Sequence, residues 1–78
     1  MPKFPTMKAK DFYKYLIKYG CEPVSINGSH FKVCNPKNGE ISSVPIHSGK
    51  DIGRYFATAI LSQLGIDVED FVEFMKNQ

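Results

Sequence analysis

The sequence has no tryptophan, only two cysteines and no long run of apolar residues. Because a helix needs ~20 apolar residues to cross a bilayer, we expect no membrane-spanning segment and no membrane partner. The N-terminus carries no basic-then-apolar leader, which argues against secretion and favours a cytoplasmic protein. Cys21 and Cys34 lack the Cys-x-x-Cys spacing of a metal site, and in a reducing compartment we expect both to be free thiols.

Net charge is also low. Ten Lys and Arg against eight Asp and Glu leave +2, a total too small to predict nucleic-acid binding by itself. The distribution is more informative, because seven of the ten basic residues precede residue 38 and five of the eight acidic residues lie beyond residue 50. A basic first half is expected of a surface that meets phosphate.

The rest of the composition is that of an ordinary soluble protein. Hydrophobic residues make up 42% of the chain and charged residues 23%, with four tyrosines and six phenylalanines to fill an interior. A chain of 78 residues has room for one hydrophobic core, so we predict a single domain over residues 1–78.

The strongest local signal is the Asn27-Gly28 pair, which favours a type I′ hairpin turn because both central residues need a positive φ. With these two as loop residues, Ser25 lies opposite His30, and Cys21 lies opposite Cys34 at a separation where a disulfide is sterically conceivable. Because successive side chains of a strand point to opposite faces, the buried face then carries Val24, Ile26, Phe31 and Val33. His30 and Lys32 fall on the open face.

Three helices and one further strand follow from spacing. The spacing of apolar residues predicts a helix over 7–19, which Thr6 caps and Gly20 ends. It also predicts a strand over 41–46, with the side chains of Val44 and Ile46 facing the core. That strand places His47 on the face of His30. A second helix is predicted from residue 52 to Gly65, capped by Ser48 or Asp51, with Tyr55, Phe56 and Ala59 among its apolar positions. Asp67 caps a third helix.

The predicted element order is therefore αβββαα. This is an α+β fold in which a three-stranded antiparallel sheet has helices on one face and leaves the histidine face open.

A surface histidine beside lysines suits phosphodiester cleavage, because imidazole exchanges protons near neutral pH and lysines can hold a phosphate. A histidine near a hairpin turn is also often a plain polar surface residue. His30 and His47 have no third ligand at suitable spacing, so a zinc site is not expected. Gly49-Lys50, placed at the start of the second helix, suits a phosphate contact or plain solvation, and Arg54 follows one turn later.

Several segments together resemble the HicA family of toxins, which are the ribonuclease halves of bacterial type II toxin–antitoxin pairs. They are Gly28-Ser29-His30, the run from Val44 to Ile52, Ile60-Leu61 and Leu64-Gly65-Ile66. The resemblance extends from Met7 to Met75. The chain departs from many relatives at Phe31, where they carry a second histidine, and at Tyr55-Phe56, where they carry Gly-Thr.

The resemblance implies a fold like that of the double-stranded RNA-binding domain. It also implies mRNA cleavage without metal or other cofactor, and a HicB-type antitoxin that covers the active surface. The family's active histidine corresponds to His30, and Gly28 and Ser29 of the motif carry over with it.

These observations lead to one hypothesis and two alternatives. In the hypothesis, His30 cleaves single-stranded mRNA by assisting attack of the adjacent 2′-hydroxyl, and the RNA is bound by Lys32, Lys37, Lys50 and Arg54. The first alternative is a non-catalytic RNA-binding module of the same fold, which would recognise RNA by shape and phosphate contacts. The second is a protein-interaction subunit with no role in RNA binding.

Overall fold

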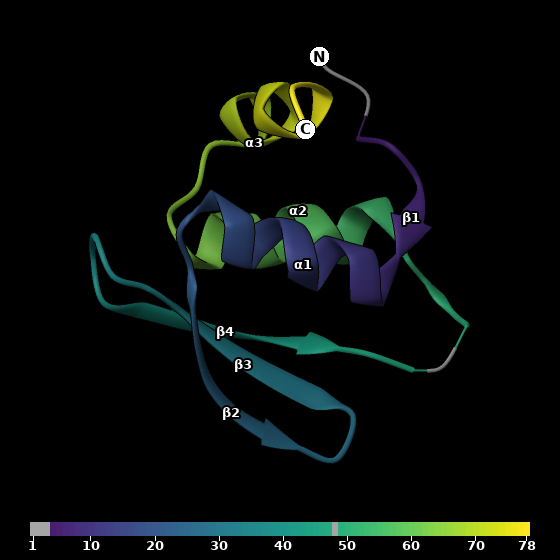
Figure 1. Ribbon diagram of the computed structural model, residues 1–78, viewed down its shortest axis with the longest axis vertical. Helices are drawn as coiled ribbons and strands as arrows, with labels where there is room; N and C mark the ends of the chain where they lie inside the picture. The colour runs from purple at the N-terminus through teal and green to yellow at the C-terminus, as the bar shows by residue number, and fades with distance from the viewer. Residues whose placement is uncertain (1–3, 48) are drawn as a thin grey trace.

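The computed structural model describes residues 4–47 and 49–78 (Figure 1). Its elements, in chain order, are β1 (Met7–Lys8), α1 (Ala9–Tyr19), β2 (Glu22–Asn27), β3 (His30–Asn35), β4 (Glu40–Pro45), β5 (Asp51–Ile52), α2 (Arg54–Gln63) and α3 (Val68–Lys76). Strands β2, β3 and β4 form an antiparallel sheet with β3 at its centre. The predicted α+β class and the αβββαα order are confirmed, with β1 and β5 added as a separate two-stranded pair.

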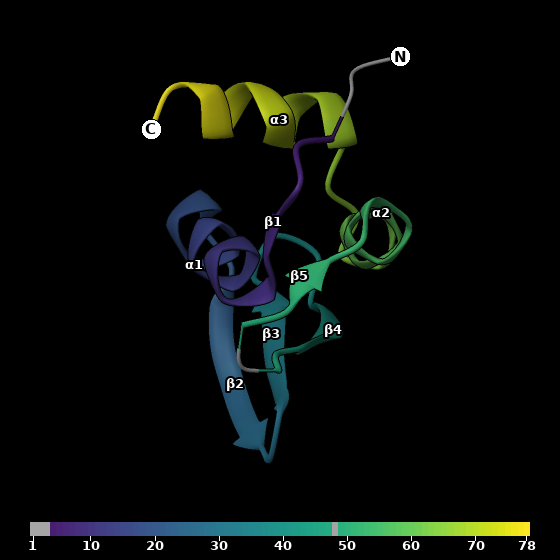
Figure 2. The same ribbon diagram turned by 90° about the vertical axis from the view of Figure 1, so that its right-hand side faces the viewer.

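The elements are stacked in layers. Helices α1 and α2 lie side by side over one face of the three-stranded sheet, and α3 lies beyond them on the side away from the sheet (Figures 1 and 2). No element of the described chain covers the other face of the sheet. The prediction of helices on one face is therefore confirmed, and the core lies between the sheet and the helices.

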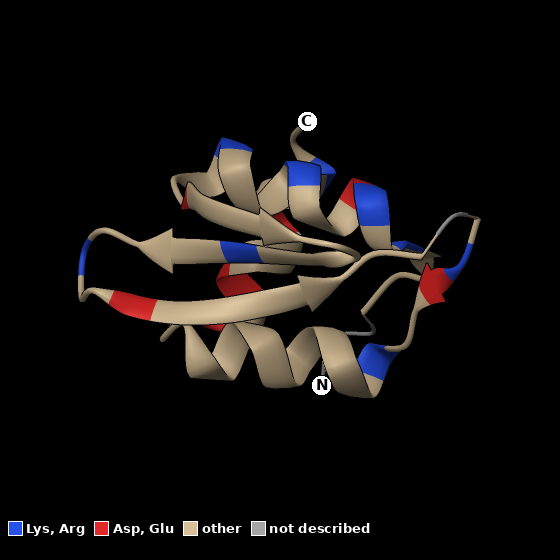
Figure 3. Ribbon diagram, turned by 90° about the horizontal axis from the view of Figure 1, so that it is seen from below, with Lys and Arg blue, Asp and Glu red and all other residues tan. Residues whose placement is uncertain are grey.

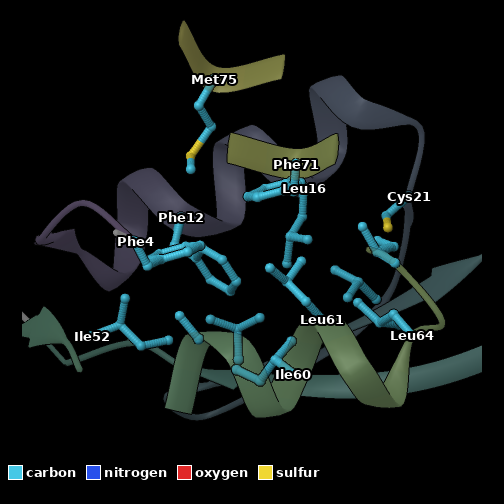
Figure 4. Close-up of a cluster of buried hydrophobic side chains, with 14 of the residues drawn as sticks. Phe4, Phe12, Leu16, Cys21, Ile52, Ile60, Leu61, Leu64, Phe71 and Met75 are labelled. Carbon is cyan, nitrogen blue, oxygen red and sulfur yellow. The ribbon is translucent and has the colours of Figure 1, made fainter. Parts of the chain in front are cut away.

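The core is built from large apolar side chains of every layer (Figure 4). Its largest fully buried side chains are those of Phe12, Phe71, Leu16, Leu61, Leu64, Val33 and Val44. The rings of Phe12 and Phe71 meet edge to face with centroids 5.7 Å apart, which attaches α3 to α1. Full burial of one such side chain contributes roughly 1.5–3 kcal/mol, so these contacts account for the position of α3.

The hairpin between β2 and β3 has a different register from the predicted one. Asn27 pairs with His30 and Ser25 with Lys32, so the two loop residues are Gly28 and Ser29 rather than Asn27 and Gly28. Gly28 has a φ of 63°, and no residue other than glycine has a positive φ in the described chain. A positive φ at the first loop position alone is typical of a type II′ turn, which needs glycine there.

Strand β2 is more exposed than predicted. The register shifts between Pro23 and Ser25, and the outer strand reaches past the helices, so Val24 is 50% exposed and Ile26 63%. Their predicted place in the core is wrong. Val33 is fully buried, and Phe31 packs its ring against Tyr13 with centroids 5.1 Å apart, as the alternation predicted for these two.

The cysteines also differ from the predicted pairing. Cys34 lies opposite Glu22, not opposite Cys21, and both thiols are free, as expected. Burial of the Cys21 thiol raises its pKa, and the electrostatic effect of Cys34 raises the pKa by a smaller amount.

Two helices begin later than predicted because short strands take their first residues. Met7 pairs with Ile52 and Lys8 with Asp51, so α1 starts at Ala9 and α2 at Arg54. Neither Thr6 nor Asp51 acts as a cap. Lys8 and Gly53 occupy the N-cap positions without a side-chain hydrogen bond, and Ser48, the other candidate cap, lies outside the described residues.

The remaining boundaries match the prediction more closely. Gly20, with a φ of 130°, ends α1, and the Asp67 side chain caps α3 by accepting a hydrogen bond from the Asp70 N–H at 3.1 Å. On β4, Val44 is fully buried and Ile46 packs against the core. In α2, the prediction that Tyr55, Phe56 and Ala59 lie on the buried face is wrong, because all three are exposed.

A buried asparagine joins the sheet to the helical layer. The Asn35 side chain donates a hydrogen bond to the Leu64 carbonyl at 2.8 Å and accepts one from the Lys37 N–H at 3.1 Å. Asn38, which is exposed, donates to the same carbonyl at 3.0 Å. The end of α2 is thus fixed to the end of β3.

The Asn35→Ala substitution should lower the free energy of unfolding by about 1–3 kcal/mol, because the Leu64 carbonyl loses its buried donor and keeps only Asn38, and the Lys37 N–H loses its acceptor. Urea denaturation measures this change. Asn38→Ala is the matched control and should cost less, since water can replace an exposed amide. Equal losses for the two variants would show that burial of Asn35 is not the cause.

Candidate functional site

His30 is the first residue of the central strand and is held from both sides. It pairs with Asn27 of β2 and with Pro45 of β4. Next to it, the Ser29 carbonyl accepts a hydrogen bond from the Ile46 N–H at 2.7 Å. The backbone that carries His30 is therefore fixed, while its side chain is exposed.

His30 shares the open face of the sheet with Lys32. Phe31 and Val33 point to the helices, so the alternating positions His30 and Lys32 point to the uncovered face. Ser25 and Ser43 flank Lys32 on the neighbouring strands. The predicted register placed Ser25 beside the histidine, but the structure places Asn27 there, because the turn lies one residue further along.

Lys37 lies at the opposite end of the sheet. It follows β3 in the connection to β4, and its N–H is bound to the Asn35 side chain at 3.1 Å. At about 3.3 Å per residue, β3 carries the chain roughly 16 Å from His30 before that connection begins. The structure therefore does not bring Lys37 and His30 together.

Lys50 is in the connection before β5, not at the start of a helix as predicted. Its N–H donates to the His47 carbonyl at 3.1 Å, and its carbonyl accepts from the Ala9 N–H at 3.2 Å. Arg54 is the first residue of α2, and β5 and Gly53 separate it from Lys50. His47 lies beyond the end of β4 at Pro45, so strand alternation does not determine its face.

One basic residue at this connection was not predicted. The Lys8 ammonium group donates a hydrogen bond to the Gly49 carbonyl at 3.3 Å, which places it next to Lys50. The contact depends on the pairing of β1 with β5. Two-residue strands have no periodicity, so no sequence signal could have located it.

The basic residues do not form one compact patch. Figure 3 shows the sheet from its open side, with Lys or Arg on β3, on the connections at both ends of the sheet and on the helices. This arrangement suits an extended anion better than a small one. Among the described residues, no three His, Cys, Asp or Glu side chains are grouped so that they could hold a metal ion. Within residues 4–47 and 49–78, no helix is long and apolar enough to cross a membrane.

The structure thus combines an α+β fold with a histidine that lies beside a glycine turn on an open sheet face. The sequence of the chain also matches a known class of proteins. A sequence model described as "HicA toxin of bacterial toxin-antitoxin" matches residues 9–66. The chain therefore belongs to the HicA family, whose members are toxins of bacterial toxin–antitoxin systems.

A particular relative supports this membership. The chain is 37% identical over 60 residues to the probable mRNA interferase HicA of Pseudomonas fluorescens (strain Pf0-1), and the match covers 77% of this chain and 97% of the relative. No solved structure matches the chain.

The turn that presents His30 should depend on glycine at position 28. Gly28→Ala should destabilise the protein by about 1–2 kcal/mol, because a side chain disfavours the φ of 63° even though a Cβ would meet no atom within 4 Å. Thermal or urea unfolding measures the loss. Ser29→Ala is the control and should leave stability nearly unchanged; a larger loss from Ser29→Ala than from Gly28→Ala would contradict the turn assignment.

Proposed function

We propose that the protein is the toxin of a type II toxin–antitoxin pair and acts as a metal-independent endoribonuclease on mRNA, with His30 as its catalytic residue. The observation that carries the proposal is the exposed His30 on the open face of the sheet, in a chain that belongs to the HicA toxin family. A relative that is 37% identical bears the name probable mRNA interferase, which supports RNA as the substrate.

In the proposed reaction, the 2′-oxygen of a ribose attacks the adjacent phosphorus and the 5′-oxygen of the next nucleotide leaves. The His30 imidazole takes the proton from the 2′-hydroxyl while water protonates the leaving oxygen, or it protonates the leaving oxygen while water takes the proton of the 2′-hydroxyl. Such a contribution is typically worth about 10²–10⁴-fold in rate. Lys32, on the same face, balances the negative charge that builds up on the phosphate oxygens. The exchange of protons requires an accessible imidazole, which the exposure of His30 supports.

Gly28 and Ser29 are proposed to contact the RNA next to His30. The turn that they form is held to the end of β4 through the bond between the Ser29 carbonyl and the Ile46 N–H. Because Gly28 has no side chain, and a Cβ there would meet no atom within 4 Å, an RNA strand can approach the backbone of the turn closely.

The remaining basic residues are proposed to extend the contact along the RNA. Lys50 and Arg54 hold phosphates on one side of the site, and Lys37 holds them at the far end of the sheet. Electrostatic contacts of this kind add affinity without sequence preference, and salt weakens them. An extended single strand can reach all of these positions.

The proposed protein partner is a HicB-type antitoxin that covers the open face. Membership in a toxin–antitoxin family supports such a partner. The open face also carries Ile41, an apolar side chain that is 46% exposed and that a partner would bury. Covering this face would block access to His30.

His30→Ala should abolish RNA cleavage and growth arrest without unfolding the protein, because the side chain is exposed and only its imidazole is lost. Cleavage of labelled RNA in the presence of a chelator and circular dichroism measure the two properties. His47→Ala is the matched control, since it removes the other exposed histidine, and we expect it to retain most of the activity.

Continued cleavage by a folded His30→Ala variant would show that His30 is not the catalytic residue. Salt-sensitive RNA binding without cleavage by the wild-type protein would instead identify a non-catalytic RNA-binding module. The same assays therefore separate the two functions.

Lys32→Ala should weaken binding of every RNA and reduce the salt dependence by about one phosphate contact, because Lys32 lies beside His30. Lys37→Ala should weaken binding of long RNA but leave a short oligonucleotide unaffected, since Lys37 lies at the other end of β3. Fluorescence anisotropy across a salt series measures both effects. If the Lys37→Ala variant, and not the Lys32→Ala variant, lost binding of the short oligonucleotide, the proposed position of the RNA next to His30 would be ruled out.

A further inference from the structure

Two aromatic side chains lie outside the core. Of the four tyrosines and six phenylalanines, eight are buried or half-buried. Tyr55 is 84% exposed and Phe56 59%, and their rings stand edge to face with centroids 6.5 Å apart. The buried face of α2 is supplied by Ala57, Ile60 and Leu61, so the fold does not use this pair. Large exposed aromatic side chains in one place point to a binding surface.

The pair lies on the far side of β4 from His30. Gln63, seven residues after Phe56 and therefore on the same side of α2, accepts a hydrogen bond from the Ser42 hydroxyl of β4 at 2.9 Å. Figure 1 shows that α2 and β4 run in opposite directions, with the start of α2 above the end of β4. Phe56 thus lies over the part of β4 that carries Pro45, the residue opposite His30.

The charges around the pair differ between its two sides. Arg54 precedes it in the helix, and Lys50 lies in the connection before β5. On the side of α3, Tyr55 lines a groove of about 480 Å³ that also contains Arg54, the apolar side chains of Phe4 and Val68, and the carboxylates of Asp67 and Glu69. Those carboxylates repel phosphate, so a nucleic-acid backbone would run on the Lys50 side and leave its bases to the rings.

We propose that Tyr55 and Phe56 form a stacking platform for unpaired bases of the RNA strand that is bound at His30, an inference that rests on the proposed function. A strand on the open face would cross the edge of the sheet at β4 to reach the rings. Aromatic rings bind single-stranded RNA by stacking on its free bases, whereas in a duplex the bases stack on one another. A protein surface could also use such rings, and Phe4 and Val68 line the groove beside Tyr55. The cation of Arg54 in the same groove, next to the pair in the chain, favours a nucleic-acid strand.

The test is the affinity of the full-length protein for a fluorescein-labelled 2′-O-methyl oligo(A), which lacks the attacking hydroxyl and is not consumed by the proposed reaction. Tyr55→Ala and Phe56→Ala should each raise Kd by roughly 5- to 150-fold, the usual value of one stacked base. Tyr55→Leu and Phe56→Leu, which keep apolar area but lose the flat ring, should also bind more weakly. Ile26→Ala, at an apolar residue 63% exposed on the opposite edge strand, is the control and should bind like wild type.

A second probe tests the contribution of the bases to binding. On the same oligonucleotide with abasic positions, which keeps the phosphates, the wild-type protein should bind weakly and the aromatic substitutions should add no further loss. Equal losses on both probes would overturn the proposal, as would leucine variants that bind like wild type. Variants that keep full RNA affinity but no longer capture the antitoxin would assign the pair to a protein interface and overturn it as well.

The outcomes also separate this inference from the proposed function. If the wild-type protein binds neither probe, the proposed function fails and the platform fails with it. If the wild-type protein binds and cleaves RNA while all aromatic variants match it, only the platform fails. If His30→Ala still cleaves RNA, the catalytic assignment fails, but a weaker affinity of the aromatic variants still supports the platform.

Discussion

The burial of Val33 in the central strand is the constraint on which the candidate site depends. Val33 is fully buried between the sheet and the helices, and Phe31 packs against α1. Because successive side chains of a strand point to opposite faces, burial of these two residues turns His30 and Lys32 to the open face. A slip of one residue would exchange the two sets and place a lysine in the core, at a cost far above that of one hydrogen bond. The hydrophobic core therefore orients the histidine without contacting it.

The helical layers stabilise this arrangement from the other side of the sheet. Phe71 of α3 packs on Phe12 of α1, and Asn35 joins β3 to the end of α2. The proposed substrate contacts come from different layers, with His30 on the sheet, Lys50 in a connection and Arg54 on a helix. Their relative positions follow from core packing and not from direct contact between them, and the ligand that we propose for them is a single strand that runs over several layers.

The sequence predicted those parts of the fold that rest on long periodic patterns or strong caps. The order of elements, the three-stranded sheet and the Asp67 cap were all visible, because each depends on residues that are close together in the chain. The hairpin register was not, since Asn27-Gly28 and Gly28-Ser29 are both acceptable turns and only the pairing of the complete strands selects one. The exposure of Val24 and Ile26 was missed because alternation says which face a residue takes but not how far the helices extend over it.

The site was predictable to a similar degree. Strand alternation placed His30 and Lys32 on one face, and the family resemblance indicated His30 as the active histidine. The position of Lys50 was wrong because the pairing of β1 with β5 takes the residues that otherwise would begin α2. That pairing joins residues more than forty positions apart through two residues each, and no local pattern encodes it. Tyr55 and Phe56 were predicted as core residues because apolar spacing cannot distinguish an exposed apolar surface from an interior.

Both outer strands of the sheet contain a proline, Pro23 in β2 and Pro45 in β4. Neither residue has an N–H to donate to another chain, and the irregular pairing after Pro23 further disturbs that border. A sheet with an uncovered face and exposed Val24, Ile26 and Ile41 would otherwise be prone to continuous strand pairing between copies. The two prolines thus oppose edge-to-edge strand pairing between copies of a protein whose sheet has one uncovered face.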